Sequence, residues 1–265
     1  MASLHWEGFL AGAVAGASGT LVGHAFDTAK VIEQVGGSVP RQTMNLRTLY
    51  RGILPPLLTT GFLRSLNFGI FEEMKLRLAG TQDANLPTTF TAAALAGAAI
   101  CPLTAPIVTF KITQQVHGGS LMECARDVLR RGGIRLLYRG FPLHFGCECF
   151  GNGAYLTTYA YAKQLVARDD RYISRVACGA VAGWAGWLTI YPLDVLRSRV
   201  ISSGARSSAP LTPLAAARTC YAERGILGFF VGIRLTLLRA APVAGVVLPI
   251  NDLMLRLLNS EHRSC

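Results

Sequence analysis

The stretch YPLDVLRSR, residues 191–199, ends an apolar segment and combines a proline, an acid and two cations. Pro192 inside a helix removes one backbone hydrogen bond and kinks the helix. Asp194 and Arg197 are three residues apart and therefore share one helix face. Because an unpaired charge is costly in apolar surroundings, each of these charges needs a partner on a neighbouring helix. The stretch therefore predicts a kinked helix that packs in a bundle through a charged face.

Two weaker copies of this pattern lie upstream, at residues 25–30 (AFDTAK) and 105–111 (APIVTFK). The first copy keeps Asp27 and Lys30, but it has alanine for the proline and isoleucine for the second cation. The second copy keeps its proline and Lys111, but Val108 takes the place of the acid. Each copy ends an apolar segment, so we expect the three stretches to play related structural roles.

A second motif, aromatic-x-glycine, follows each copy. It recurs 88 residues and then a further 92 residues along the chain, as Tyr50-Arg51-Gly52, Tyr138-Arg139-Gly140 and Phe230-Val231-Gly232. Self-similarity at a fixed period indicates a repeat architecture. The sequence predicts three repeats of span, polar segment and span, at residues 1–82, 83–169 and 170–265.

The composition favours a membrane protein. Of the 265 residues 51% are hydrophobic and 15% charged, whereas a soluble domain has about 25% charged residues. A bilayer span needs about 20 mainly apolar residues. Six segments meet that length, at residues 8–26, 53–71, 90–110, 141–161, 174–193 and 233–255. A buried helical bundle in a soluble protein accounts poorly for six such segments.

Taken together, the three copies in register resemble the mitochondrial carrier family over nearly the whole chain. The resemblance implies an all-α membrane protein of six tilted transmembrane helices in three pseudo-threefold repeats, each with a short matrix helix. It also implies a monomeric solute transporter of the mitochondrial inner membrane that works by alternating access without an enzyme activity or a cofactor.

The resemblance assigns the charges of the three copies to a gate at the matrix end. The family pattern pairs Asp27 with Lys111 and Asp194 with Lys30. Arg197 then faces Val108 and has lost its partner. The alternative is that these charges only lock the packing of the helices.

The even-numbered spans carry a second set of charges, similar to the family's cytoplasmic gate: Glu72, Lys75, Lys163 and Asp252. Ala160 and Leu255 stand where the pattern has a further acid and a further cation. A full ring needs three acids and three cations, so we expect the cytoplasmic gate to be weakened.

The glycines of the aromatic-x-glycine motif precede the even-numbered spans. A helix start offers free N–H groups to an anion, and the resemblance makes Gly52, Gly140 and Gly232 candidate sites for cardiolipin. The alternative is an ordinary turn residue. Tyr50 follows Asp27 by only 23 positions, so we expect any matrix helix of the first repeat to be short.

The resemblance places substrate contacts midway along the even-numbered spans, at Thr60, Cys147, Glu148 and Arg239. Arg64 and Asn67 are further candidates on the second span. A carboxylate inside an apolar segment by default marks a functional site, although Glu148 could instead pair privately with His144, one turn earlier.

An acid opposite arginine suits a zwitterionic metabolite with a positive group. Parts of the chain look like carnitine/acylcarnitine and basic amino-acid carriers, and the short first matrix segment resembles S-adenosylmethionine carriers. The carnitine/acylcarnitine and basic amino-acid carriers have an arginine where this chain has Cys147. How the anionic end of the solute is bound therefore stays open.

Other functions are less favoured. The net charge of +11 would suit a nucleic-acid binder, but the basic residues lie mostly at the ends of apolar segments, where they face anionic headgroups. The seven cysteines form no CxxC pair, so no metal site is expected. A membrane-embedded enzyme would need a base and a nucleophile that the spans do not pair. A degenerate carrier that acts as a proton leak or scaffold stays open.

Overall fold

The computed structural model describes residues 6–35, 45–80, 85–117, 120–165, 172–206 and 211–239, together with residues 243 and 250. Within these residues every regular element is a helix. The long helices are α1 (Trp6–Gln34), α3 (Leu54–Ala79), α4 (Leu86–His117), α6 (Phe141–Leu165) and α7 (Tyr172–Arg206).

The first five predicted spans fall inside these five long helices. The sixth predicted span is described only in part, and residues 233–239 of it are helical. By length and apolar composition alone, one of the described helices qualifies as a membrane span, at Leu86–Val116. Several of the other long helices carry glycine and polar residues, which lower their mean hydropathy.

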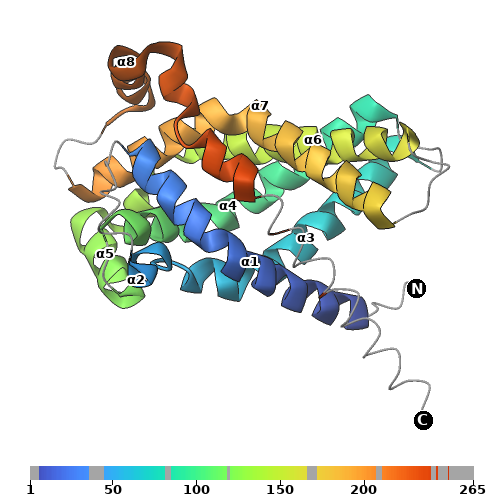
Figure 1. Ribbon diagram of the computed structural model, residues 1–265, viewed down its shortest axis with the longest axis horizontal. Helices are drawn as coiled ribbons and strands as arrows, with labels where there is room; N and C mark the ends of the chain where they lie inside the picture. The colour runs from blue at the N-terminus through green and yellow to red at the C-terminus, as the bar shows by residue number, and fades with distance from the viewer. Residues whose placement is uncertain are drawn as a thin grey trace, which may run out of the picture.

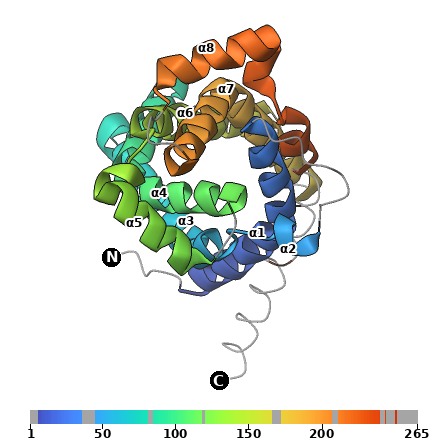
Figure 2. The same ribbon diagram turned by 90° about the vertical axis from the view of Figure 1, so that its left-hand side faces the viewer.

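The long helices run side by side along the long axis of the molecule (Figure 1). Seen along that axis, they surround a common centre in chain order (Figure 2). α3 packs against both α1 and α4, and α6 packs against both α4 and α7. The ring closes between the last described helix and α1, because a Cβ on Gly23 would lie 3.2 Å from the Arg239 Cδ atom.

Three short helices gather at one end of the long axis (Figure 1). They are α2 (Leu46–Leu49), α5 (Leu121–Leu137) and α8 (Pro213–Arg224), the last followed by the 3-10 helix η2 (Gly225–Phe230). The prediction that any helix between the first two spans is short is confirmed, because α2 has 4 residues against 17 in α5 and 12 in α8.

The N-terminus of α5 is fixed by a capping box. The Ser120 side chain accepts from the Glu123 N–H at 3.2 Å, and the Ser120 N–H donates to the Glu123 carboxylate at 2.8 Å. The backbone hydrogen bond from Ser120 lowers the pKa of this exposed carboxyl. Thr212 caps α8 through its own side chain. Both α5 and α8 therefore begin after a residue whose hydroxyl accepts a hydrogen bond from the first turn of the helix.

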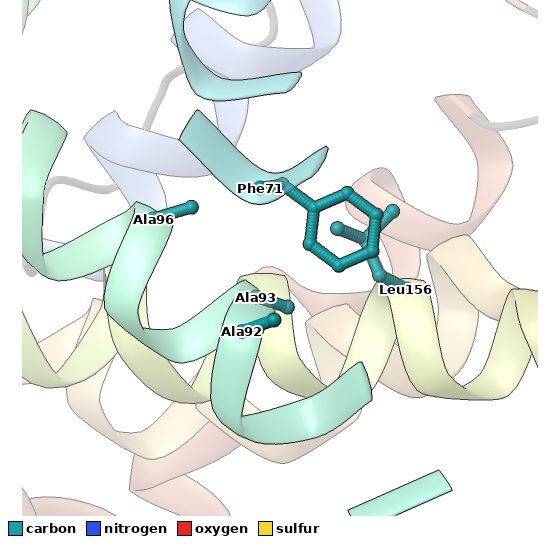
Figure 3. Packing of buried hydrophobic residues seen from close by; sticks show 5 residues of the cluster. All are labelled: Phe71, Ala92, Ala93, Ala96 and Leu156. Atoms are coloured by element: carbon teal, nitrogen blue, oxygen red, sulfur yellow. The ribbon is translucent and has the colours of Figure 1, made fainter. Parts of the chain in front are cut away.

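At the opposite end, small residues allow three helices to approach closely. Phe71 of α3 lies over Ala92, Ala93 and Ala96 of α4, next to Leu156 of α6 (Figure 3). The three alanines are fully buried. Phe71 directly precedes Glu72, one of the predicted cytoplasmic charges, so its burial holds this part of α3 against α4.

The three motif glycines occupy equivalent turns. Gly52, Gly140 and Gly232 all have φ between 73° and 83°, the left-handed region that favours glycine. A Cβ on Gly52 would meet α4, one on Gly140 would meet α7, and one on Gly232 would meet α1. Each repeat therefore packs its turn against the first helix of the next repeat, and the third packs against the first.

We expect Gly52→Ala to destabilise the protein, because alanine costs about 1–2 kcal/mol in the left-handed region. The new Cβ would also lie 3.1 Å from the Lys111 carbonyl oxygen. The thermal unfolding midpoint of detergent-solubilised protein measures the effect. The control is Gly69→Ala, where a Cβ meets nothing within 4 Å and helix propensity improves by up to about 1 kcal/mol. Equal unfolding midpoints for the two variants would contradict the assignment of Gly52 to a turn that requires glycine.

Candidate functional site

Two ion pairs join the long helices at the end that carries α2, α5 and α8. Lys111 Nζ of α4 lies 2.9 Å from Asp27 of α1, and Lys30 Nζ of α1 lies 2.5 Å from Asp194 of α7. Both pairs are the ones that the sequence predicted, so the contacts are confirmed.

Asp194 is the most enclosed acid of this cluster, with 2% of its side chain exposed. It accepts from Lys30 of α1 and from Arg197 of its own helix. Gln34 donates to the same carboxylate at 3.1 Å. Two cations and an amide therefore share one buried acid, which compensates both positive charges inside the bundle, while Arg197 Nε and Gln34 Oε1 find no hydrogen-bond partner among the described residues.

The expectation that Arg197 has no partner is wrong. Its guanidinium pairs with Asp194 on its own helix and donates to His144 Nδ1 of α6 at 3.0 Å. The motif spacing considered only the first helix of each repeat, whereas His144 comes from the second helix of repeat two. The missing acid is thus replaced by an imidazole from a different helix.

Val108 itself fills its position with apolar contacts. It packs with Val35 and Val116 against the buried side chains of Val31, Ile112 and Ile201. These residues come from α1, α4 and α7, so the cluster draws the three helices together beside the ion pairs. Loss of the acid at position 108 is therefore accompanied by an apolar contact rather than by a gap.

Lys30 and Arg239 both lie over the same indole. Lys30 Nζ is 4.1 Å from the centroid of the Trp187 ring, and the Arg239 guanidinium carbon is 5.6 Å from it. The negative face of an aromatic ring attracts cations. Trp187 therefore helps to hold two cations in one place, a role that the sequence analysis did not foresee.

Arg239 lies with the matrix-end charges. Its guanidinium is 2.6 Å from Asp27, the acid that also holds Lys111. The side chains of Arg239 and Asp27 are 24% and 19% exposed. The proposed substrate contact on the sixth span thus shares its acid with a predicted gate pair.

Glu148 has no close cationic partner among the described residues. Asn152, one turn later on α6, donates to its carboxylate at 3.3 Å. His144 Nε2 lies 3.9 Å from the Glu148 carboxylate, which is longer than a hydrogen bond. The alternative that Glu148 pairs with His144 is therefore only partly realised. Glu148 keeps 25% of its side chain exposed. Asn152, four residues after Glu148, could have been found from helix spacing alone.

The other predicted substrate contacts are not brought together with Glu148 by any hydrogen bond or ion pair within the described ranges. The Thr60 hydroxyl donates to the Pro56 carbonyl of its own helix. Cys147 is buried, with 3% exposure. Arg64 is exposed and Asn67 half-buried. Their place in a substrate site stays a prediction.

The predicted cytoplasmic charges behave differently from the matrix-end charges. Lys75 lies 3.8 Å from Glu72 on the same helix, and both side chains are exposed. Lys163 lies over the Tyr159 ring of its own helix. Asp252 lies outside the described residues. Across the part of α3 and α6 that the structure describes, no ion pair joins these two helices at this end.

Comparison with known proteins identifies relatives along the whole chain. The family described as mitochondrial carrier protein matches residues 3–81, 82–170 and 168–262. A mitochondrial substrate carrier family protein S of Dictyostelium discoideum is 30% identical, covering 94% of this chain and 96% of its own. A mitochondrial basic amino acids transporter of Bos taurus is 31% identical, with coverages of 89% and 86%. A mitochondrial glycine transporter of Saccharomyces cerevisiae is 31% identical, with coverages of 94% and 90%.

We expect Asp194→Asn to lower the free energy of unfolding by about 3–5 kcal/mol, because removing one partner leaves buried cations uncompensated. The unfolding midpoint in detergent measures it. Glu73→Gln is the control, since Glu73 and Arg77 form an exposed pair at 2.6 Å within α3 and such pairs contribute about 0–1 kcal/mol. A small change in the unfolding midpoint for both variants would refute the inference that Asp194 compensates two buried cations.

Proposed function

The chain belongs to the mitochondrial carrier family, which makes it a multi-pass transporter of the mitochondrial inner membrane, and we propose that it exchanges a basic amino acid by alternating access. The proposal includes the six-helix, three-repeat arrangement, with the sixth helix continuing beyond residue 239. It also takes the matrix-end ion pairs as a gate that closes and opens during each cycle.

The proposed choice of solute rests on the surroundings of the Glu148 carboxylate. Its carboxylate meets an amide rather than a close cation among the described residues, and a quarter of its side chain is exposed. A carboxylate inside an apolar helix is costly and marks a functional site by default. A cationic group of the solute would supply the charge that Glu148 lacks.

Arg239 supplies the complementary charge for a carboxylate. Its guanidinium is held by Asp27 and lies over Trp187, and guanidinium groups bind carboxylates in bidentate geometry. A solute carboxylate at Arg239 competes with Asp27, which in turn holds Lys111. Binding of the solute would therefore break the Asp27–Arg239 pair, one of the contacts that join the helices at the matrix end, and this would link recognition to opening of the proposed gate.

The names of the relatives support an amino acid. One relative is a basic amino acids transporter and another is a glycine transporter. An acid without a close cation favours the basic solute over glycine, because glycine has no side-chain cation. Carnitine, acylcarnitine and S-adenosylmethionine carry a similar pair of charges and remain alternatives that a solute panel distinguishes.

The arrangement of charges also suggests which state the structure represents. The matrix-end acids pair across helices, whereas Glu72 and Lys75 pair within one helix. We assign this to a state closed at the matrix end. The turns at Gly52, Gly140 and Gly232 remain proposed cardiolipin sites on a monomeric carrier, although their positive φ explains each glycine without a lipid.

The test is uptake of labelled arginine into liposomes that contain the purified protein and internal arginine. We expect uptake by the natural sequence and its loss in Glu148→Gln. A charged hydrogen bond is worth about 1.5–3 kcal/mol, so affinity falls roughly tenfold to a hundredfold. Cys149→Ser, at the next position of α6, controls for disturbance of the helix.

Three outcomes separate the alternatives. Uptake that is unchanged in Glu148→Gln removes Glu148 from the site. Uptake of carnitine or S-adenosylmethionine, but not arginine, redirects the solute within the same charge class. Absence of exchange over the whole panel would favour the degenerate carrier, which acts as a leak if protons cross the membrane and as a scaffold if they do not.

A further inference from the structure

The third side of the matrix end is joined by a histidine instead of an acid. The motif would pair position 108 of repeat two with Arg197 of repeat three, but Val108 carries no charge. Arg197 instead donates to His144 Nδ1 at 3.0 Å. His144 belongs to repeat two, so this hydrogen bond crosses the same boundary between repeats as the missing ion pair.

The hydrogen bonds of His144 fix its protonation state. A guanidinium has donors and no acceptor, so Nδ1 must carry a lone pair while it faces Arg197. Nε2 then carries the proton and donates to the Thr104 hydroxyl of α4 at 2.8 Å. The Thr104 hydroxyl in turn donates a hydrogen bond to the Cys101 carbonyl at 3.2 Å. The imidazole is therefore neutral in this state, and 2% of the residue is exposed.

The ionisable groups around this imidazole come from three helices. From α7, the Arg197 guanidinium opposes a second positive charge, and Asp194 is already engaged by Arg197 and Lys30. On α6 itself, Glu148 Oε1 lies 3.9 Å from Nε2, and Cys147 is a buried free thiol. From α4, Thr104 is not ionisable, and Cys101 is likewise a buried free thiol.

We propose that His144 is a proton-binding site whose occupancy is linked to opening of the matrix end. This inference rests on the proposed gate. When repeat three moves away, His144 loses Arg197 but keeps Thr104 and Glu148, because both belong to its own repeat. A proton from water then binds Nδ1, and the imidazolium faces the Glu148 carboxylate with no cation beside it. Closure returns Arg197 and expels the proton.

This linkage has a defined sign. The open state binds one more proton than the closed state, so acid favours opening. One linked proton changes the equilibrium by at most about tenfold per pH unit. The response should fall near the range in which an imidazole ordinarily titrates, between about pH 6 and pH 8.

The test follows opening directly and does not depend on the solute. Cys147 is buried next to His144 on α6, so a variant that keeps Cys147 as its only cysteine reports water access by its rate of reaction with a thiol reagent. Each rate is divided by that of the denatured protein at the same pH, which removes the effect of pH on the thiol itself. We expect the corrected rate to rise severalfold as pH falls through this range.

Two further variants identify the group responsible. His144→Gln keeps an acceptor for Arg197 and a donor for Thr104 but binds no proton, so its corrected rate should be independent of pH. Val108→Asp restores an acid opposite Arg197, and the pH response should shrink because Arg197 no longer governs His144. The same pH response in His144→Gln as in the parent would overturn the proposal.

Arginine uptake separates this inference from the proposed function. Uptake with a flat labelling profile means that the carrier works and the proton site is absent. A pH-dependent labelling profile that His144→Gln removes, without arginine uptake, means that the proton site stands and that the proposed solute fails.

Discussion

The structure depends on pairing a few charges across the ends of apolar helices. Asp27 and Asp194 each hold two cations, and the cations come from four different helices. None of these charges could stay buried alone, because an uncompensated charge in a low dielectric costs several kcal/mol. Mutual satisfaction therefore fixes which helices meet and in what order. It also makes the closed end sensitive to any molecule that offers one of these charges a different partner.

The second cation of the motif and its acidic partner are present together in repeat three and are missing together in repeat two. In repeat three, Arg199 pairs with Glu223 of the matrix helix at 2.8 Å. At the corresponding positions of repeat two stand Thr113 and Arg131, so the cation and its acid are both absent. In repeat one the second cation is Ile32, and the matrix helix is the four-residue α2. Loss of only one partner would leave a charge without its counter-ion, and repeat two avoids this at the second cation by lacking both.

The apolar stretches of the chain predicted the long helices. The resemblance to the carrier family predicted both cross-helix ion pairs, because it pairs the acid of each copy with the cation of the next copy. It did not predict His144 beside Arg197 or Arg239 beside Asp27. These contacts involve the even-numbered spans, which are the second helix of each repeat. The rotation of these helices depends on side-chain packing rather than on the motif. The alanines under Phe71 and the turn at each motif glycine help to set that rotation. The glycines recur along the sequence, but their recurrence does not show which side chains then meet.

The same acid serves recognition and closure in the proposed mechanism, and this has a consequence for specificity. Asp27 holds Lys111 of the gate and Arg239 of the proposed substrate site at once. A solute with only a cation could engage Glu148, yet it would leave the Asp27–Arg239 pair intact and the matrix end closed. A solute with only a carboxylate would free Asp27 but would be repelled by Glu148. In the proposed mechanism, opening would therefore require both charges on one molecule, and the distance between them would select among the amino acids and betaines that carry such a pair.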